Sequence, residues 1–451
     1  MDLHFLGATG TVTGSKYLLR HGSSVLMVDC GLFQGYKQLR LRNWAELPVD
    51  PASIDAVILT HAHVDHSGYL PLLARQGFRG KVYCTRPTLE LSRILLIDSG
   101  HLQEEEAEYM DRHRLSRHTP ALPLYTEEDA RRCLKQFVAV DHGKAWSPAP
   151  GLQVTLSPAG HMLGAACVRV EADCSILFSG DLGRNSDLLL RGPARPPASD
   201  YLVVESTYGD RLHEKEDPLQ KLADVINRTA GRGGKVIIPA FAVGRAQSMI
   251  YAIHLLKSRK LIHNLPVFLN SPMAAQAMRI YQQFPHEHRL SPEQTEAMCN
   301  TATIVDTPDQ SRALNGRHGP MVIIAASGMA TGGRVVHHLK AFAPDHRNTI
   351  LFAGYQAGGT RGAKMLAGAP TVRIHGEDVP VRAEVASLDN YSAHADAAEL
   401  IDWMSSFPRP PRQTFVTHGE PDAADALRWR IEHELRWSCR VPDYLESVPL
   451  Q

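Results

Sequence analysis

A cluster of histidines and one aspartate carries the strongest chemical signal in the chain. The stretch Thr60–Gly68 reads THAHVDHSG and holds four metal-binding groups within six residues: His61, His63, Asp65 and His66. Alternate residues of an extended backbone face the same side, so His61 and His63 can face one metal ion. Asp65 and His66 can serve a second ion. Imidazole and carboxylate are the ligand types expected at catalytic zinc, which keeps an open position for water. A histidine-rich surface turn is the alternative interpretation.

Four more polar residues each follow a short apolar run and stand beside glycine. They are Asp29 in VDCG, His161 in AGHMLG, Asp181 in SGDLG and His418 in VTHGE. Taken singly, each is typical of a cap or a turn. Taken together, four such residues after four buried strands indicate convergence at one sheet edge, where glycine permits a close backbone approach.

Two patterns of elements would position these groups. Up to about residue 210, short apolar runs such as Val25–Val28 and Ile54–Leu59 predict buried strands. Beyond it, strand, loop and helix alternate, as in Val236–Ile238 followed by Ala246–Leu256, which predicts parallel βαβ units. We therefore expect an inserted α/β domain over 211–381, flanked by two parts of one domain, 1–210 and 382–451.

One long helix is expected over Thr88–His118, and it contains a short acidic run. Three glutamates, Glu104–Glu106, are consecutive in this run. Consecutive side chains point around a helix, so the run predicts a solvated face and not a metal site.

The composition excludes several classes of protein. Lys plus Arg equals Asp plus Glu, 48 each, so a nucleic-acid partner would require basic residues gathered on one face. The seven cysteines form no C-x-x-C pair, which disfavours disulfides and a thiolate zinc site. No apolar run is long enough to span a bilayer, and no signal segment is visible, so a cytoplasmic location without membrane contact is expected.

The motifs resemble those of a known family. HAHVDH with the downstream G-H and G-D elements is similar to the signature of the metallo-β-lactamase superfamily, an αββα sandwich. ESTYG at 205–209, SAHAD at 392–396 and THGE at 417–420 resemble the motifs of its β-CASP nucleic-acid-processing branch, whose inserted α/β domain matches AASGMATGGR at 325–334 and GYQAGGTRG at 354–362. That branch includes the nuclease subunit of the cleavage and polyadenylation machinery, and the chain is most similar to its short prokaryotic members.

The resemblance implies a set of metal ligands for two Zn²⁺ ions per chain. The first ion would be held by His61, His63 and His161, and the second by Asp65, His66 and His418, with Asp181 bridging. Asp29 would orient a ligand histidine.

The same resemblance implies hydrolysis of RNA by a two-metal hydroxide mechanism. Cleavage within the RNA chain is expected, and additional 5′-exonuclease activity is left open. A histidine at 418 is typical of members that act on RNA and disfavours DNA. His394 would donate a proton to the leaving oxygen with Glu205 holding its tautomer, and Asp65 would orient the nucleophile.

Five residues are expected to contact the phosphates of the substrate. Ser392 would bind a phosphate oxygen, and the loop that contains Ser327 and Gly328 can aim backbone N–H groups at phosphate, with Arg334 and Arg361 adding positive charge. Single-stranded RNA is therefore the expected partner, and a homodimer is left open. The alternatives are a hydrolase of small esters or thioesters and a catalytically silent scaffold.

Overall fold

The structure, a computed structural model, describes residues 1–114, 118–214, 216–388 and 391–451. The chain forms two compact units. Unit 1 contains Met1–Asn185, Gly192–Leu212 and His394–Gln451, and unit 2 contains Ser186–Arg191 and His213–Ala393. The chain thus leaves unit 1 near residue 212 and returns at residue 394, while the family-domain boundaries at 211 and 381 remain a prediction.

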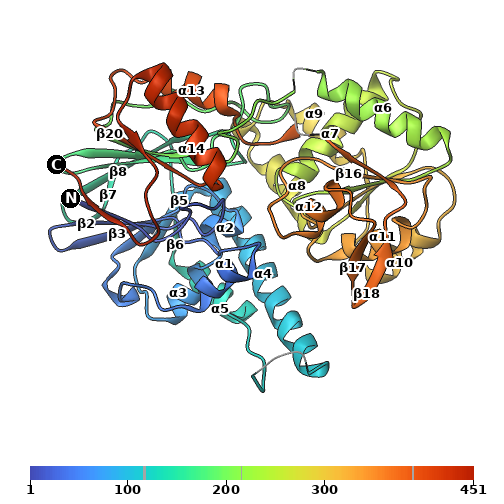
Figure 1. Cartoon of the computed structure of the whole chain (residues 1–451), viewed down its shortest axis with the longest axis horizontal. Coiled ribbons are helices and arrows are strands. Elements are labelled where there is room, and N and C mark those ends of the chain that lie inside the picture. The colour runs from blue at the N-terminus through green and yellow to red at the C-terminus, as the bar shows by residue number, and fades with distance from the viewer. Residues whose placement is uncertain (115–117, 215, 389–390) are drawn as a thin grey trace. The chain divides into compact units, whose positions relative to one another are not determined.

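Unit 1 is built on two seven-stranded sheets (Figure 1). The first has the order β22 (Ser447–Pro449), β1 (Asp2–Phe5), β2 (Tyr17–His21), β3 (Ser24–Val28), β4 (Ala56–Ile58), β5 (Lys81–Thr85) and β6 (Phe137–Val140). The second has the order β21 (Cys439–Arg440), β20 (Gln413–Thr417), β11 (Tyr201–Glu205), β10 (Ser175–Phe178), β9 (Ala166–Glu171), β8 (Leu152–Pro158) and β7 (Trp146–Ala149). Strands β3 to β6 are parallel, as are β10, β11 and β20, so the loops after each set leave from one sheet edge.

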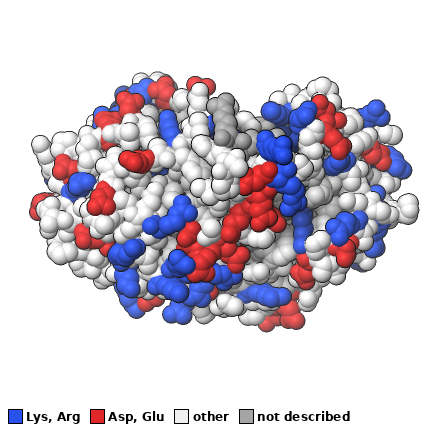
Figure 2. All heavy atoms as spheres, turned by 90° about the horizontal axis from the view of Figure 1, so that it is seen from below, with Lys and Arg blue, Asp and Glu red and all other residues white. Residues whose placement is uncertain are grey.

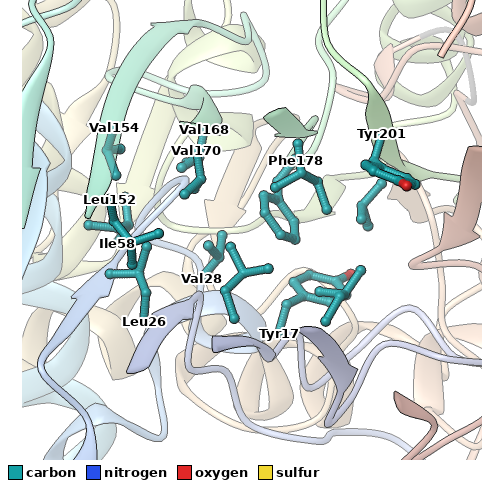
Figure 3. Packing of buried hydrophobic residues seen from close by; sticks show 14 of the residues in the cluster. Tyr17, Leu26, Val28, Ile58, Leu152, Val154, Val168, Val170, Phe178 and Tyr201 are labelled. Atoms are coloured by element: carbon teal, nitrogen blue, oxygen red, sulfur yellow. The ribbon is translucent and has the colours of Figure 1, made fainter. Parts of the chain in front are cut away.

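The core of unit 1 lies between these two sheets. Leu26, Val28 and Ile58 of the first sheet pack with Val154, Val168 and Phe178 of the second, and none of the six is more than 1% exposed (Figure 3). The inward positions of β8 alternate with outward ones, as expected for a sheet with one buried face. Burying each such side chain contributes about 1.5–3 kcal/mol, and this fixes the register of the strands that lead to the site.

Helices cover the outer faces of the sandwich. Those of unit 1 are α1 (Lys37–Leu41), α2 (Val64–Ser67), α3 (Leu70–Arg75), α4 (Arg86–Arg112), α5 (Glu127–Cys133), α13 (Ala397–Ser405) and α14 (Pro421–Arg430). A second core, which includes Leu73, Leu96 and Tyr125, packs α3 to α5 against the first sheet, while α13 and α14 lie over the second (Figure 1). The expected αββα sandwich is confirmed. Helix α4 ends at Arg112, and the predicted continuation includes 115–117, which lie outside the described residues.

Unit 2 contains a six-stranded sheet in which every neighbouring pair is parallel. Its order is β14 (Thr303–Ile304), β13 (Val267–Asn270), β15 (Val322–Ala325), β12 (Val236–Pro239), β16 (Thr349–Phe352) and β19 (Glu384–Ser387). Its helices are α6 (Pro218–Gly231), α7 (Arg245–Ser258), α8 (Pro272–Gln283), α9 (Pro292–Cys299), α10 (Pro308–Gly316), α11 (Arg334–Phe342) and α12 (Arg361–Leu366), and a hairpin joins β17 (Thr371–Ile374) to β18 (Glu377–Pro380). The alternating pattern therefore predicted this inserted parallel domain correctly. Among the described residues, no helix has both the length and the apolar character needed to cross a bilayer.

Candidate metal centre

Loops that leave both sheets of unit 1 meet at one place. Asp29 follows β3, the HAHVDH stretch follows β4, Asp181 follows β10 and His418 follows β20, while His161 lies in the turn between β8 and β9. The structure brings together in this way all seven residues expected as metal ligands: His61, His63, Asp65, His66, His161, Asp181 and His418.

The first group of ligands converges on one point. Nδ1 of His63 lies 3.1 Å from Nε2 of His61 and 3.2 Å from Nε2 of His161. Oδ2 of Asp181 lies 3.5 Å from Nε2 of both His61 and His161. Three nitrogens and one carboxylate oxygen thus surround a common centre.

The second group lies on the other side of Asp181. Nε2 of His66 is 3.0 Å from Nε2 of His418 and 3.3 Å from Oδ1 of Asp181. Oδ2 of Asp65 is 3.5 Å from Nε2 of His418. Because Oδ2 of Asp181 faces the first group and Oδ1 faces the second, its carboxylate links the two.

These spacings suit zinc. With bonds of about 2.0 to 2.1 Å, the donor atoms of a tetrahedral zinc site lie about 3.3 Å from one another. The four distances in the first group, 3.1 to 3.5 Å, agree with that value. Oδ1 of Asp181 is also buried without a hydrogen-bond partner among the described residues, although a buried carboxylate oxygen is normally paired. The donor set therefore fits a pair of metal ions.

Neighbouring polar groups orient the ligand rings. Nδ1 of His66 donates to Oδ2 of Asp29 over 2.7 Å, which leaves Nε2 to face the centre. Thr60 accepts from Nδ1 of His61 at 3.0 Å and donates to Asp29, to which its backbone N–H also donates. Asp29 thus lies behind the ligands, as expected for an orienting residue.

Burial and neighbouring charges set the protonation states. Burial lowers the pKa of His61 and His161 well below the usual range and that of His63 to about 4, so these rings are neutral and offer lone pairs. Burial alone would raise the pKa of Asp181, but the nearby imidazoles, led by His418 and His66, hold it well below its usual range. Neutral imidazole and ionised carboxylate are the forms that bind metal.

The backbone is unusual where it carries the site. Asp29 and His418 have φ of 57° and 49°, in the left-handed region that non-glycine residues seldom adopt. Gly31 allows close contact, since a Cβ there would lie 1.6 Å from the backbone oxygen of Asp65. The β3 loop can therefore pack directly beneath the ligand-bearing turn.

His394 and Glu205 form a pair beside the ligands. Nδ1 of His394 donates to Oε2 of Glu205 at 3.0 Å, and its Nε2 lies 3.9 Å from Oδ2 of Asp181. The backbone N–H of Leu182 donates to Oε1 of Glu205 over 2.6 Å, which fixes the carboxylate. Burial lowers the pKa of His394, but Glu205 and Asp181 outweigh it and raise the pKa to about 9, so the ring carries a proton at neutral pH.

The residues expected to bind phosphate belong to unit 2. Ser392 is buried on the segment that precedes His394. Arg334 donates to Oδ1 of Asn270 and to the backbone oxygens of Val305 and Asp306.

Arg361 and the glycine-rich loop around Ser327 also have protein partners. Arg361 donates to the backbone oxygens of Ala330 and Arg373. Ser327 bonds to Thr331, and Gly328 accepts from Gln356. In the structure Arg361 contacts this loop at Ala330, whereas Arg334 binds the end of β13 and the segment after β14, and the phosphate-binding role of both arginines stays a prediction.

Two orienting residues were not expected from the sequence. Thr60 holds both His61 and Asp29, and Oγ1 of Thr207 lies 3.2 Å from Nδ1 of His418. The sequence indicates these two threonines only by their place in the motifs, since Thr60 precedes His61 and Thr207 lies in ESTYG.

The chain matches three known protein domains and several known proteins. Residues 9–221 match the metallo-beta-lactamase superfamily, residues 246–365 the Beta-Casp domain, and residues 378–442 the Zn-dependent metallo-hydrolase RNA specificity domain. Ribonuclease TTHA0252 of Thermus thermophilus is 37% identical over 93% of this chain and 94% of its own length. Transcription termination factor FttA of Methanocaldococcus jannaschii is 32% identical over 94% of this chain and 68% of its own length.

A solved structure shares the fold. It is a protein of unknown function from Enterococcus faecalis, and it aligns with a TM-score of 0.55 at 13% identity, covering 100% of this chain and 99% of its own. Together with the sequence matches and the histidine–aspartate cluster, this agreement means that the chain belongs to the β-CASP ribonucleases of the metallo-β-lactamase superfamily.

Proposed function

We propose that this metal-dependent RNA hydrolase holds two zinc ions and cuts phosphodiester bonds of single-stranded RNA, mainly endonucleolytically. The observation that carries the proposal is the position of Asp181. Its two carboxylate oxygens face two separate ligand groups, 3.5 Å from His61 and His161 on one side and 3.3 Å from His66 on the other.

The chain's residues have distinct roles in this proposal. His61, His63 and His161 hold the first ion, Asp65, His66 and His418 hold the second, and Asp181 is shared. When bound, two zinc ions stabilise charge on phosphoryl oxygens and lower the pKa of water from 15.7 to about 7. Asp29 keeps His66 in the tautomer that presents Nε2, and Asp65, whose side chain is 20% exposed, is placed to orient a water molecule.

His394 supplies the proton for the leaving group. Its proton is held on the imidazolium by Glu205 and Asp181, and Nε2 is the nitrogen that faces the ligand cluster. We expect this nitrogen to protonate the 3′-oxygen as it leaves, which yields a 5′-phosphate product. Ser392, the loop around Ser327 and Gly328, and the positive charges of Arg334 and Arg361 remain the proposed phosphate contacts of unit 2.

The proposal is tested with purified protein and labelled substrates. Metal content is measured first, and two zinc ions per chain are expected. The protein is then incubated with 5′-labelled and internally labelled RNA, the same sequence as DNA, and small ester and thioester substrates. RNA cleavage with 5′-phosphate ends is expected, together with its loss in Asp181→Ala. Equal cleavage by Asp181→Ala, or turnover of only the small esters, would contradict the proposal.

A further inference from the structure

A basic and aromatic surface is exposed on unit 1, on the segment that follows the β3 loop. It is formed by Tyr36, Lys37, Arg40, Leu41 and Trp44, and we call it the 36–44 surface. It spans α1 and the following 3₁₀ turn, Arg42–Trp44. We propose that the 36–44 surface binds the single-stranded RNA substrate through its phosphates and bases. This inference rests on the ribonuclease function proposed above.

The segment is fixed beside the ligand-bearing turn. It follows the β3 loop, in which the N–H groups of Cys30 and Leu32 donate to the backbone oxygens of His66 and Val64 at 2.7 and 2.9 Å. The buried side chain of Asn43 then closes the segment, accepting from the N–H of Phe33 and donating to its carbonyl oxygen at 2.9 and 2.8 Å. The surface is therefore a clamped loop that starts within a few residues of the site.

The positive charge of this surface is not neutralised. Residues 36–44 read YKQLRLRNW, with three cations and no carboxylate. Lys37 and Arg40 are exposed and have no acidic partner within ion-pair distance among the described residues. Some exposed arginines of unit 1 are paired, as Arg131 is with Glu127 at 2.6 Å, whereas Arg20 and Arg86, like Arg40, have no acidic partner within ion-pair distance among the described residues. Two unpaired cations in one short loop favour a polyanion.

Large apolar side chains are exposed among these cations. Tyr36 and Leu41 are each 56% exposed, and Trp44 is 59% exposed. Exposed aromatic rings interleaved with basic residues are typical of surfaces that bind single strands, since bases stack on the rings while phosphates meet the cations. Tyr, Trp and Arg are also enriched in protein interfaces, so the salt dependence of RNA binding, which follows from contacts between cations and phosphates, decides between the two kinds of partner.

The overall charge of zero hides such local patches. On the face shown in Figure 2, groups of basic side chains lie beside groups of acidic ones, so charge of one sign is gathered locally. Residues 36–44 gather three basic side chains in one short segment, Lys37, Arg40 and Arg42, which is the kind of local grouping that the overall charge does not reveal.

The test uses two double variants and a charge-matched control. Lys37→Ala/Arg40→Ala removes the cations, and Tyr36→Ala/Trp44→Ala removes the rings. The control Arg20→Ala/Lys81→Ala removes two exposed cations at the other ends of the strands, the end of β2 and the start of β5. Melting temperature, affinity for a 20-nucleotide single-stranded RNA at several salt concentrations, and hydrolysis of bis(p-nitrophenyl) phosphate are measured.

Each variant has its own expected outcome. The charge variant should reduce the slope of log K against log salt by about 1.4, since each phosphate contact to a single strand contributes about 0.7. The aromatic variant should weaken RNA binding about 5- to 150-fold for each stacked base that is lost. The control should bind RNA as the wild type does, and all three should hydrolyse the small phosphodiester at the wild-type rate.

The outcomes separate this inference from the proposed function. If the wild type neither binds nor cuts RNA, the ribonuclease proposal itself fails. If the wild type cuts RNA and the charge variant binds it with unchanged affinity and salt slope, the 36–44 surface is not an RNA site. Sedimentation of each variant is also compared with that of the wild type. A variant with a changed oligomeric state and unchanged RNA affinity would assign the surface to contacts between copies of this chain and overturn the inference. If the aromatic variant misfolds, the charge variant decides the matter alone, because its side chains are exposed.

Discussion

At the scale of single residues, the site depends on how each ligand is held from behind. A histidine binds metal through one nitrogen, and the partner of the other nitrogen selects which one. Nδ1 of His66 contacts Asp29, Nδ1 of His61 contacts Thr60 and Nδ1 of His418 contacts Thr207, so in each ring Nε2 is left to face the centre. Glu205 accepts from Nδ1 of His394 in the same way, and we propose that the other nitrogen of His394 donates its proton to the leaving oxygen.

Replacing His394 should separate catalysis from metal binding. We expect His394→Ala to lower kcat on RNA by about 10²- to 10⁴-fold, the usual contribution of a general acid, with no loss of metal. Because the acid must be protonated, the wild-type rate should fall as pH rises through the pKa of His394, and the variant should lack that decline. Steady-state rates across pH and metal analysis of both proteins check this. Substantial metal loss in the variant would show that His394 is a ligand.

Replacing Asp29 should weaken metal binding without touching a ligand. Asp29→Asn removes the charge that polarises the N–H of His66, and we expect about 10- to 100-fold weaker zinc affinity. Competitive titration with a chromophoric chelator measures it. Asp55→Asn is the matched control, since Asp55 accepts from Val25 N–H at the opposite end of β3. Equal affinities of the two variants would contradict the orienting role.

At the scale of elements, strand ends determine where the chemistry lies. Parallel strands β3 and β4 deliver Asp29 and His61 to one edge, and parallel strands β10, β11 and β20 deliver Asp181, Glu205 and His418. The opposite ends of β10 and β11, where these strands begin, are held together by contacts that involve no metal ligand. Asp200, before β11, accepts from the N–H and Oγ of Ser175 and from Arg409.

The contacts of Asp200 should make unit 1 sensitive to acid. Burial would raise the pKa of Asp200, but the bonds from Ser175 and Arg409 outweigh it and lower the pKa to about 2. A depressed pKa adds stability above the unfolded value of about 3.9, and that stability is lost as pH falls from about 4 to about 2.

The corresponding variant is Asp200→Asn. We expect it to lower the free energy of unfolding by about 1 to 2 kcal/mol at pH 7, a figure discounted because Arg409 is half exposed. The difference from wild type should vanish near pH 2. Urea unfolding in chelator at several pH values measures it, with exposed Asp402→Asn as control. A difference that persists undiminished at pH 2 would exclude the ionic cause.

At the scale of the whole molecule, the two compact units have separate cores. Unit 1 has its core between the two sheets, and unit 2 has one around Ile323, Leu339 and Ile350. All seven proposed metal ligands belong to unit 1. Metal binding should therefore stabilise one unit and not the other.

Calorimetry tests this division. We expect two unfolding transitions, and zinc at 100 times its Kd should stabilise only one of them, by about 2.7 kcal/mol for each ion bound. Chelator should reverse the shift, because it removes the ions that bind the folded unit in preference to the unfolded chain. A zinc-dependent shift of both transitions by the same amount would show that the units unfold together.

The sequence alone determined what is local in this protein. The ligand types of THAHVDHSG, the apolar runs that end at Asp29, Asp181 and His418, and the strand–helix alternation after residue 211 are properties of short segments. Periodicity and turn chemistry act over a few residues, so they are visible without coordinates. Resemblance to a family then supplied the ligand assignments that spacing left open.

The tertiary structure decided how distant segments meet. That Asp181 faces two ligand groups, that Asp29 and His418 adopt positive φ, and that Arg334 and Arg361 donate to backbone oxygens all depend on strand register and side-chain packing. A shift of one residue in β10 would turn the buried side chains of this strand to the other face of its sheet and displace the loop that carries Asp181. Only burial of the core between the two sheets fixes that register, because the contacts that select it join residues far apart in the chain.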